Sequence, residues 1–227
     1  MTQRLRIWFG RSEVAAQLTN SDILRVSRGA IGEVQRLLCD DACERPKLAV
    51  AASLPAGMTA ESDVLDAFLE SGIAPRAVRE WLPAALPEGI ALVDVQEVGM
   101  GLPSLQSDIR WAEYVVGLTA SGVVESAEAA VSCFLGRGSL PWEEVRDAKI
   151  RRYDIRPLVL DLTVCNQDSS VLEMRLRTDA AITGRPEQVV IALGLGLPAA
   201  VHRRRLGLAT KSQVLAAWRR SGRFTDN

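Results

Sequence analysis

The sequence contains one histidine, four cysteines and only three lysines among its 27 basic residues. A single histidine, His202, is too few for a histidine-rich zinc site, and a Ser-His-Asp triad would have to use it. Four cysteines in 227 residues are too few for a disulfide framework, so a reducing cytoplasm is the expected location. These scarcities predict a protein with no metal site and no cofactor.

Long apolar runs are also missing. None approaches the roughly 18 residues of a transmembrane helix, so we expect no membrane span. The first residues, Met1 to Arg6, lack the apolar core of a signal peptide. The 48% hydrophobic and 24% charged residues are typical of a globular protein. At about 100–200 residues per domain, the length predicts one large domain or two small ones.

The net charge of −1 conceals an uneven distribution. Residues 1–110 contain 11 basic and 15 acidic side chains, whereas residues 111–227 contain 16 and 13. Seven basic residues and no acidic residue lie within 202–225. We therefore expect a partner to bind the basic second half.

Hydrophobic periodicity in the first half predicts the order β-α-β-β-α-β. Residues 3–9 alternate as a strand, and residues 23–37 place apolar side chains at helical spacing. Two apolar runs, 48–54 and 64–69, predict a hairpin. Pro75 opens a second helix, and residues 90–98 form the last strand. This order is typical of the ferredoxin-like split-βαβ fold.

The second half repeats the order after a linker rich in glycine and proline. We expect strands at 114–118, 149–164, 171–177 and 200–206, helices at 126–135 and from Pro186, and a short C-terminal helix capped by Thr210. The prediction is an α+β protein made of tandem, duplicated ferredoxin-like halves. The first half is 1–98, the linker 99–110, the second half 111–209, and the C-terminal helix and tail 210–227.

The run Lys149-Ile-Arg-Arg-Tyr-Asp-Ile-Arg-Pro-Leu158 resembles the most distinctive motif of the radical-SAM-linked proteins, a bacterial family built on a domain of unknown function. Four further stretches agree in order, and they begin at Arg4, Asp22, Pro46 and Leu86. The resemblance covers roughly residues 3–206. It implies a radical SAM protein as partner and an RNA-modification setting.

Two expected histidines are absent. The first helix of the family usually begins with Ser-His-x-Asp, and a Gly-Phe-Asn-Pro-His-Pro-Lys stretch precedes the hairpin. Here Thr19-Asn-Ser-Asp22 and Cys43-Glu-Arg-Pro-Lys47 take these places. If the histidines form a catalytic or metal site in relatives, this chain has lost it and keeps Asp22, Arg25 and Lys47 as polar remnants.

Two groups of charged residues are candidate binding sites. Arg152, Asp154 and Arg156 alternate on a predicted strand, so they would share one face and bind a phosphate or carboxylate. The alternative is a cross-strand ion pair on a solvated face. Asp22 and Arg25 lie three apart at a helix start, where they form either an anion site or a cap with its i+3 partner.

Arginines and aromatics interleave on the outer faces of three predicted strands, where they predict a nucleic-acid surface. The alternative is that arginine simply replaces lysine throughout the chain. The residues concerned are Arg4, Arg6 and Trp8; Arg175 and Arg177; and Arg203, Arg204 and Arg205.

Two short motifs are weaker indications of a catalytic or cluster-binding site. Cys39-x-x-x-Cys43 copies the first spacing of a radical SAM cluster motif, but no third cysteine follows shortly. Arg177-Thr-Asp179-Ala resembles the aspartate loop of a pseudouridine synthase, whose Gly-Val-His-Ala continuation is absent. Reduced thiols and a strand-to-helix turn are the simpler interpretations.

Three functional hypotheses follow. The first is a non-catalytic accessory module that binds RNA or a protein. The second is an RNA-modifying enzyme or radical SAM partner acting on an anionic substrate between the halves, which requires Asp22 and Asp154 to meet in one cleft. The third is a dimerisation or protein-interaction module that uses exposed sheet edges. The oligomeric state is left open.

Overall fold

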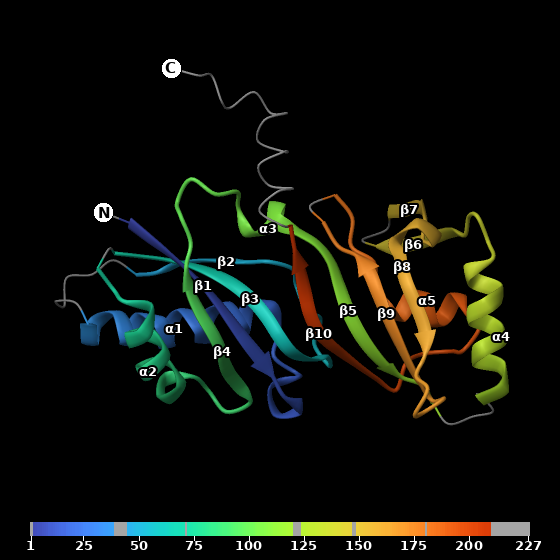
Figure 1. Ribbon diagram of the computed structural model, residues 1–227, viewed down its shortest axis with the longest axis horizontal. Helices are drawn as coiled ribbons and strands as arrows, with labels where there is room; N and C mark the ends of the chain where they lie inside the picture. The colour runs from blue at the N-terminus through green and yellow to red at the C-terminus, as the bar shows by residue number, and fades with distance from the viewer. Residues whose placement is uncertain are drawn as a thin grey trace, which may run out of the picture. The chain divides into compact units, whose positions relative to one another are not determined.

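The computed structural model describes residues 2–38, 45–70, 72–119, 124–146, 149–179 and 181–209, and it is an α+β protein (Figure 1). The chain divides into two compact units, which we call unit 1 (Met1–Arg110 and Leu206–Asn227) and unit 2 (Trp111–Arg205). The predicted C-terminal helix and the Cys39–Cys43 motif lie outside the described residues. No helix in the described ranges is long and apolar enough to cross a bilayer.

Unit 1 has the predicted element order. Strand β1 pairs antiparallel with β3 on one side and β4 on the other, and β2 pairs antiparallel with β3. The strand order is therefore β4-β1-β3-β2. The elements are β1 (Thr2–Arg11), a 3-10 turn η1 (Glu13–Ala15), α1 (Asn20–Leu38), β2 (Lys47–Val50), β3 (Thr59–Glu70), α2 (Pro75–Ala85), β4 (Ile90–Glu97) and α3 (Leu105–Asp108).

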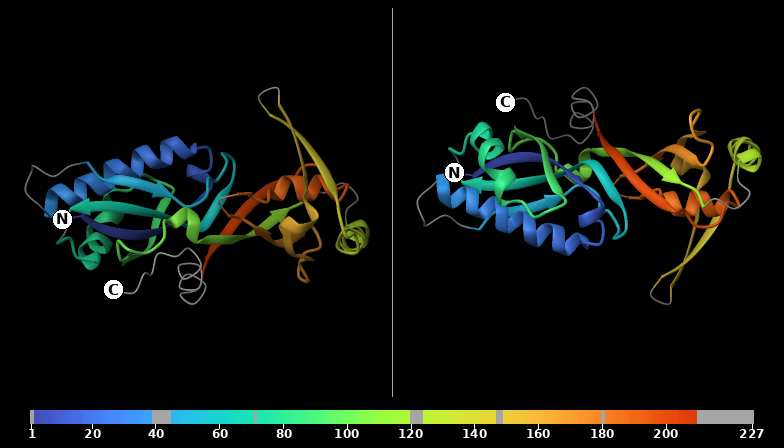
Figure 2. Two further views of the ribbon diagram at one scale, coloured as in Figure 1. Left: turned by 90° about the horizontal axis from the view of Figure 1, so that it is seen from above. Right: turned by 90° about the horizontal axis from the view of Figure 1, so that it is seen from below.

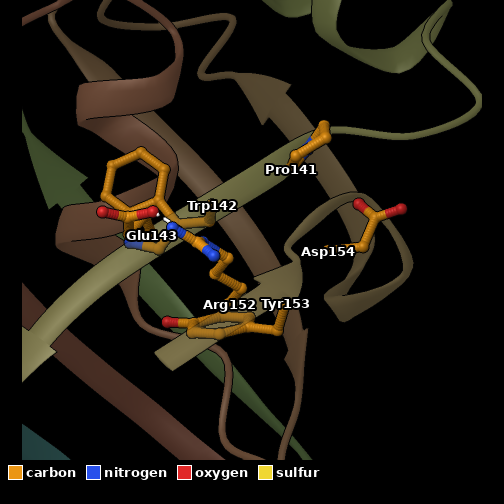
Figure 3. Close-up of a pocket in the computed structure, with 6 residues that line it drawn as sticks. All are labelled: Pro141, Trp142, Glu143, Arg152, Tyr153 and Asp154. Atoms are coloured by element: carbon orange, nitrogen blue, oxygen red, sulfur yellow. Dashed lines mark hydrogen bonds and ion pairs between the residues drawn. The ribbon is translucent and has the colours of Figure 1, made fainter. Parts of the chain in front are cut away.

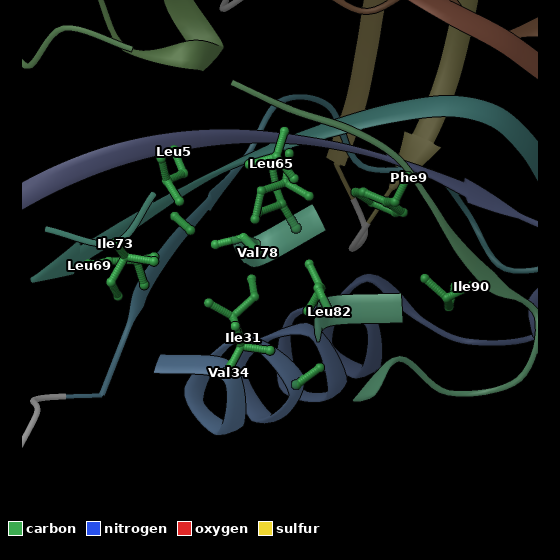
Figure 4. Close-up of a cluster of buried hydrophobic side chains, with 14 of the residues drawn as sticks. Leu5, Phe9, Ile31, Val34, Leu65, Leu69, Ile73, Val78, Leu82 and Ile90 are labelled. Carbon is green, nitrogen blue, oxygen red and sulfur yellow. The ribbon is translucent and has the colours of Figure 1, made fainter. Parts of the chain in front are cut away.

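The core of unit 1 lies between this sheet and helices α1 and α2 (Figure 4). Alternation along β1 points Leu5, Ile7 and Phe9 towards the helices, as predicted, and each is nearly fully buried. The helices contribute buried apolar side chains at helical spacing, including Ile31 and Val34. Burial of this face holds both helices on one side of the sheet.

Unit 2 has the strand order β10-β5-β9-β8, with α4 and α5 packed on its buried face. Pro186 opens α5 as predicted, and Gly194 follows the helix end at a φ of 77°, a conformation that glycine adopts without strain. The elements are β5 (Ile109–Gly117), α4 (Val124–Leu135), β6 (Pro141–Arg146), β7 (Lys149–Asp154), η2 (Arg156–Leu158), β8 (Val159–Val164), β9 (Val171–Arg177), α5 (Pro186–Ala192) and β10 (Ala200–Leu208).

The single strand predicted over 149–164 is wrong. Strand β7 ends at Asp154, the chain turns through η2, and β8 begins at Val159. Pro157 has no N–H for a ladder and sits in the first turn of η2, where that donor is not needed. Strand β6 was not predicted, and it pairs with β7 as an antiparallel hairpin in a two-stranded sheet of its own.

Candidate functional site

The outer face of the unit 2 sheet carries charged and aromatic side chains across all four strands. Its inner face is apolar because alternate residues, such as Ala112, Val116 and Leu172, pack under the helices. The side chains between them point outwards. We call this surface the open face and define it by Trp111, Glu113, Asp161, Glu173, Arg175, Arg177, Arg204 and Arg205.

Trp111 lies at the centre of the contacts on the open face. The guanidinium carbons of Arg175 on β9 and Arg205 on β10 are each 5.4 Å from the centroid of its ring. Strand β5 runs between β9 and β10, so the two arginines approach Trp111 from neighbouring strands on either side. Contacts of this length between a guanidinium and an indole are attractive cation–π interactions.

Every arginine of the open face has a carboxylate partner. Glu113 accepts hydrogen bonds from Arg205 Nε at 2.7 Å and Nη2 at 3.2 Å, and its carboxylate is 3.9 Å from Arg175 Nε. Hydrogen bonding from Arg205 is the main cause that lowers the pKa of Glu113. The other pairs are Arg175–Asp161 at 3.3 Å, Arg177–Asp179 at 2.7 Å and Arg204–Glu173 at 2.8 Å.

The same face is slightly hollowed. A depression of about 120 Å³ is lined by residues of β5, β8, β9 and β10, and polar side chains make up most of its lining, including Glu113, Thr163 and Arg204. This volume is too small to enclose a metabolite, so the face suits a ligand that lies across it.

Four of the predicted nucleic-acid residues are exposed on this face: Arg175, Arg177, Arg204 and Arg205. Arg203 is not, because its side chain is only 1% exposed. Trp111 and Glu113 were not predicted, because the strand was expected to begin at Tyr114, whereas β5 begins at Ile109. Alternation of Trp111 and Glu113 with Ala112 and Tyr114 was the available signal.

The prediction that Arg4 and Arg6 face outwards is wrong. Both are buried in unit 1 around the carboxylate of Asp66, which has no exposed surface. Arg4 Nε donates to Asp66 at 2.7 Å, and Arg6 Nε donates to the same carboxylate at 2.9 Å. Arg6 also pairs with Asp108 at 3.1 Å. Trp8 beside them is half-buried.

The segment that follows β4 covers these two arginines. Arg4 donates to the carbonyl oxygens of Leu102 and Pro103, at 3.1 Å and 2.9 Å. The outer side of β1 is therefore closed by the chain itself. Buried guanidinium groups that are already paired are not available to a phosphate.

The predicted row of Arg152, Asp154 and Arg156 does not exist, because Asp154 ends β7 and Arg156 lies in η2. The Asp154 carboxylate accepts hydrogen bonds from the main-chain N–H groups of Leu140 at 2.8 Å and Arg156 at 2.9 Å. Its pKa is lowered, chiefly by a hydrogen bond from the Ser139 side chain. Asp154 therefore fixes the turn at the base of the hairpin.

Arg156 caps helix α4. It donates to the carbonyl oxygens of Leu135 and Arg137 at the helix end, at 3.2 Å and 3.1 Å, and to that of Val159 at 3.2 Å. Carbonyls at a helix C-terminus have no partner within the helix, so a guanidinium there stabilises them. The motif that carries the family resemblance thus joins α4, β7 and β8.

Arg152 remains on the hairpin, where it donates to Glu143 at 2.8 Å, and both side chains are exposed. They line a shallow depression of about 400 Å³ together with Pro141, Trp142, Tyr153 and Asp154. Figure 3 shows the Asp154 carboxylate turned away from Arg152. The ion-pair alternative is the correct interpretation for Arg152.

Asp22 and Arg25 form a helix cap in unit 1. Asp22 accepts hydrogen bonds from the N–H of Thr19 at 3.1 Å and from its hydroxyl at 2.6 Å, while that hydroxyl accepts from the N–H of Asp22 at 3.2 Å. This reciprocal arrangement is a capping box, and the hydroxyl contact is the main cause that lowers the pKa of Asp22. Arg25 is the exposed i+3 partner at 3.1 Å, and Lys47 is exposed at the start of β2.

Asp179 also has a local role. It accepts from Arg177 Nε and from the N–H groups of Ala181 and Ile182 at 2.9 Å and 3.0 Å, which supports the turn interpretation. Within the described ranges, no three histidine, cysteine, aspartate or glutamate side chains come together as metal ligands.

A family model described as "Uncharacterized protein conserved in bacteria (DUF2344)" matches residues 44–186. No curated protein matches the sequence.

Several solved structures are similar at low identity. A chain in the crystal structure of a Cbf5-Nop10-Gar1 complex is 13% identical with a TM-score of 0.46, over 95% of this chain and 56% of that one. The archaeal box H/ACA sRNP Nop10-Cbf5 complex gives 15% and 0.43, over 88% and 47%. This chain thus spans about half the length of those chains. An unknown protein from Galdieria sulphuraria gives 14% and 0.28, over 86% and 91%.

Proposed function

The chain belongs to the bacterial DUF2344 family, and we propose that it is a non-catalytic accessory protein that binds single-stranded RNA on the open face of unit 2. The observation that supports this best is the position of Trp111 between Arg175 and Arg205. An indole stacks on an unpaired base, and guanidinium groups bind phosphate. The open face offers both groups on neighbouring strands.

The charge pairing on the open face suits a single strand. Because each arginine already contacts a carboxylate, a phosphate has to compete for its donors. A guanidinium has five N–H donors, so it can accept a phosphate while it keeps part of its carboxylate contact. We expect stacking on Trp111 to contribute much of the affinity, which favours unpaired bases over a duplex whose base faces are covered.

We also propose that both units are ferredoxin-like and arose by duplication, with halves at 1–98 and 111–209 and a linker at 99–110. The strand orders β4-β1-β3-β2 and β10-β5-β9-β8 support this, because each places the first and third strands of its unit at the centre. Unit 2 differs by the β6–β7 hairpin. If the two sheets are duplicates, they differ in that the chain covers the outer side of β1 in unit 1, whereas the open face of unit 2 is exposed. We therefore place RNA binding on unit 2.

A radical SAM protein in the cytoplasm remains our proposed partner. This rests on the resemblance of residues 149–158. The absence of both family histidines supports the non-catalytic role. An accessory role fits the contacts of Asp22, Arg25, Asp154 and Arg156, the residues of the enzyme hypothesis. Helix caps and a turn account for all four without a substrate.

The test is fluorescence anisotropy with a labelled single-stranded RNA of about twelve nucleotides, within the size of typical single-strand sites. We expect Trp111→Ala to weaken binding about tenfold or more, since loss of one stacked base costs about 1–3 kcal/mol. Trp81→Ala is the control, because Trp81 is an exposed indole on α2 of unit 1. Affinity must also fall as salt rises.

A second variant should act in the opposite direction. Glu113→Gln removes the carboxylate that competes for Arg175 and Arg205, so we expect tighter RNA binding. Glu128→Gln makes the same change of charge on α4 and should have little effect. Equal affinities for the wild type and Trp111→Ala, or weaker binding by Glu113→Gln, would contradict the proposal.

A further inference from the structure

The β6–β7 hairpin is a separate two-stranded sheet fixed to α5 (Figure 2). The Tyr153 hydroxyl donates to Gln188 Oε1 on α5 at 2.8 Å, and Arg185 forms an ion pair with Glu144. At its base, the N–H of Ile155 donates to the Leu140 carbonyl at 3.0 Å. These contacts hold the β6–β7 hairpin in place, and both of its strands are edge strands.

The register shows which main-chain groups face outwards. Hydrogen-bonded and non-hydrogen-bonded pairs alternate along an antiparallel ladder. Because Leu140 and Ile155 are hydrogen-bonded, the directly opposed Glu143 and Arg152 form a non-hydrogen-bonded pair, as do Val145 and Ile150. The N–H groups of Ile150 and Arg152 therefore point away from β6. No other strand among the described residues pairs with β7.

The two edges differ in chemistry. Strand β7 carries Ile150, which is 56% exposed, between the basic residues of the motif, and the Arg152 side chain is 75% exposed. Strand β6 begins with Pro141, which has no N–H, and carries Glu143 and Glu144. The edge of β7 is thus basic and retains its donors, whereas the edge of β6 is acidic and lacks one.

We propose that the free edge of β7 binds an acidic, extended segment of a protein partner by β-strand addition. Main-chain hydrogen bonds to Ile150 and Arg152 supply affinity, and acidic side chains beside Arg151 and Arg152 supply specificity. A second copy of this chain fits poorly, because β7 against β7 brings arginine against arginine. This edge is distinct from the open face and does not depend on RNA binding.

The experiment is a titration of the ¹⁵N-labelled full chain with a peptide of alternating glutamate and valine that is long enough to pair with all six residues of β7. We expect saturable shifts and slower hydrogen exchange at the amides of Ile150 and Arg152. A peptide of alternating lysine and valine should leave them unchanged. Trp111→Ala should bind the acidic peptide like the wild type, which separates this proposal from the proposed function.

Two proline variants identify the edge. Arg152→Pro and Glu143→Pro both remove the Glu143–Arg152 ion pair, and each removes one outward N–H, from β7 and β6 respectively. Neither removes a hydrogen bond between the two strands, so both hairpins should form. We expect Arg152→Pro to weaken peptide binding about tenfold, because it removes one main-chain hydrogen bond and the guanidinium charge. Glu143→Pro should stay within about twofold of the wild type, a difference of a few tenths of a kcal/mol.

Arg152→Gln retains the N–H and should lose only the salt-dependent part of the affinity. The proposal is overturned if neither peptide binds, if the basic peptide binds equally, or if Glu143→Pro is the more damaging change. It is also overturned if single-stranded RNA instead shifts the Ile150 and Arg152 amides.

Discussion

Asp154 shows how one side chain organises the base of the hairpin. Its carboxylate accepts hydrogen bonds from the main-chain N–H of Leu140, which precedes β6, and from that of Arg156, which follows β7. Arg156 then reaches the end of α4. Asp154, Arg156 and Pro157 thereby connect β7 and β8 to the end of α4 and to the start of β6, and their role is structural.

Replacement of Asp154 tests this role. We expect Asp154→Ala to lower the free energy of unfolding by about 1–2 kcal/mol at neutral pH, because two N–H groups lose a charged acceptor. Asp154→Asn keeps one acceptor oxygen and should cost less. Urea denaturation of the three proteins measures the difference.

The pH dependence of that difference has a definite sign. The folded-state pKa of Asp154 is lowered, so its stabilising contribution is present above the ordinary aspartate pKa and is lost as pH falls through the lowered value. The difference in the free energy of unfolding between the wild type and Asp154→Ala should therefore become smaller in strong acid. A gap that is constant with pH would contradict the assigned hydrogen bonds.

Elements differ in how their edges and faces are covered. One end strand of each four-strand array carries a bulge: the register skips Val93 in β4 of unit 1 and Leu160 in β8 of unit 2, and these side chains are 54% and 52% exposed. Bulges disrupt the hydrogen-bonding row that an incoming strand needs. The regular ladder of β6–β7 lacks such a bulge, which is why we assign strand addition to the hairpin.

The segment after β4 covers the outer side of β1, where Arg4, Arg6 and Asp66 form a buried ion cluster. We expect Asp66→Ala to destabilise the protein by about 3–5 kcal/mol, because it leaves two buried guanidinium groups without their carboxylate. Arg25→Ala, which breaks an exposed pair on α1, should cost less than about 1 kcal/mol. Chemical denaturation compares the two variants, and a similar small loss in both would mean that the cluster is not buried in solution.

Sequence periodicity predicted the elements that bury one apolar face. The strands that include Leu5 and Leu172 and the helices that include Val34 and Phe134 are confirmed, because burial imposes a regular spacing. The β6–β7 hairpin was missed because neither of its strands contributes a regular apolar stripe to a core. In addition, the apolar residues between β7 and β8 make the sequence pattern of 149–164 look like that of one long strand.

Across the whole chain, alternation predicted on which side of a strand each arginine lies but not whether that side is covered. Arg4 and Arg175 occupy similar positions in their strand patterns, yet Arg4 is buried by the segment that follows β4 and Arg175 is exposed. Coverage depends on contacts between distant residues, such as Arg4 with Leu102 and Pro103, which no local pattern contains. The sequence therefore predicted part of the candidate site, namely the arginines of the open face in the second half of the chain.

The central claim is that single-stranded RNA lies across Trp111 on the open face. Photo-crosslinking of the full chain to a single-stranded RNA that contains 5-iodouridine, followed by mass spectrometry of the peptides, tests it most directly. The account predicts crosslinks at Trp111 and in β9, and their loss from Trp111→Ala without loss from Trp81→Ala. Crosslinks confined to unit 1, or to the hairpin, would contradict it.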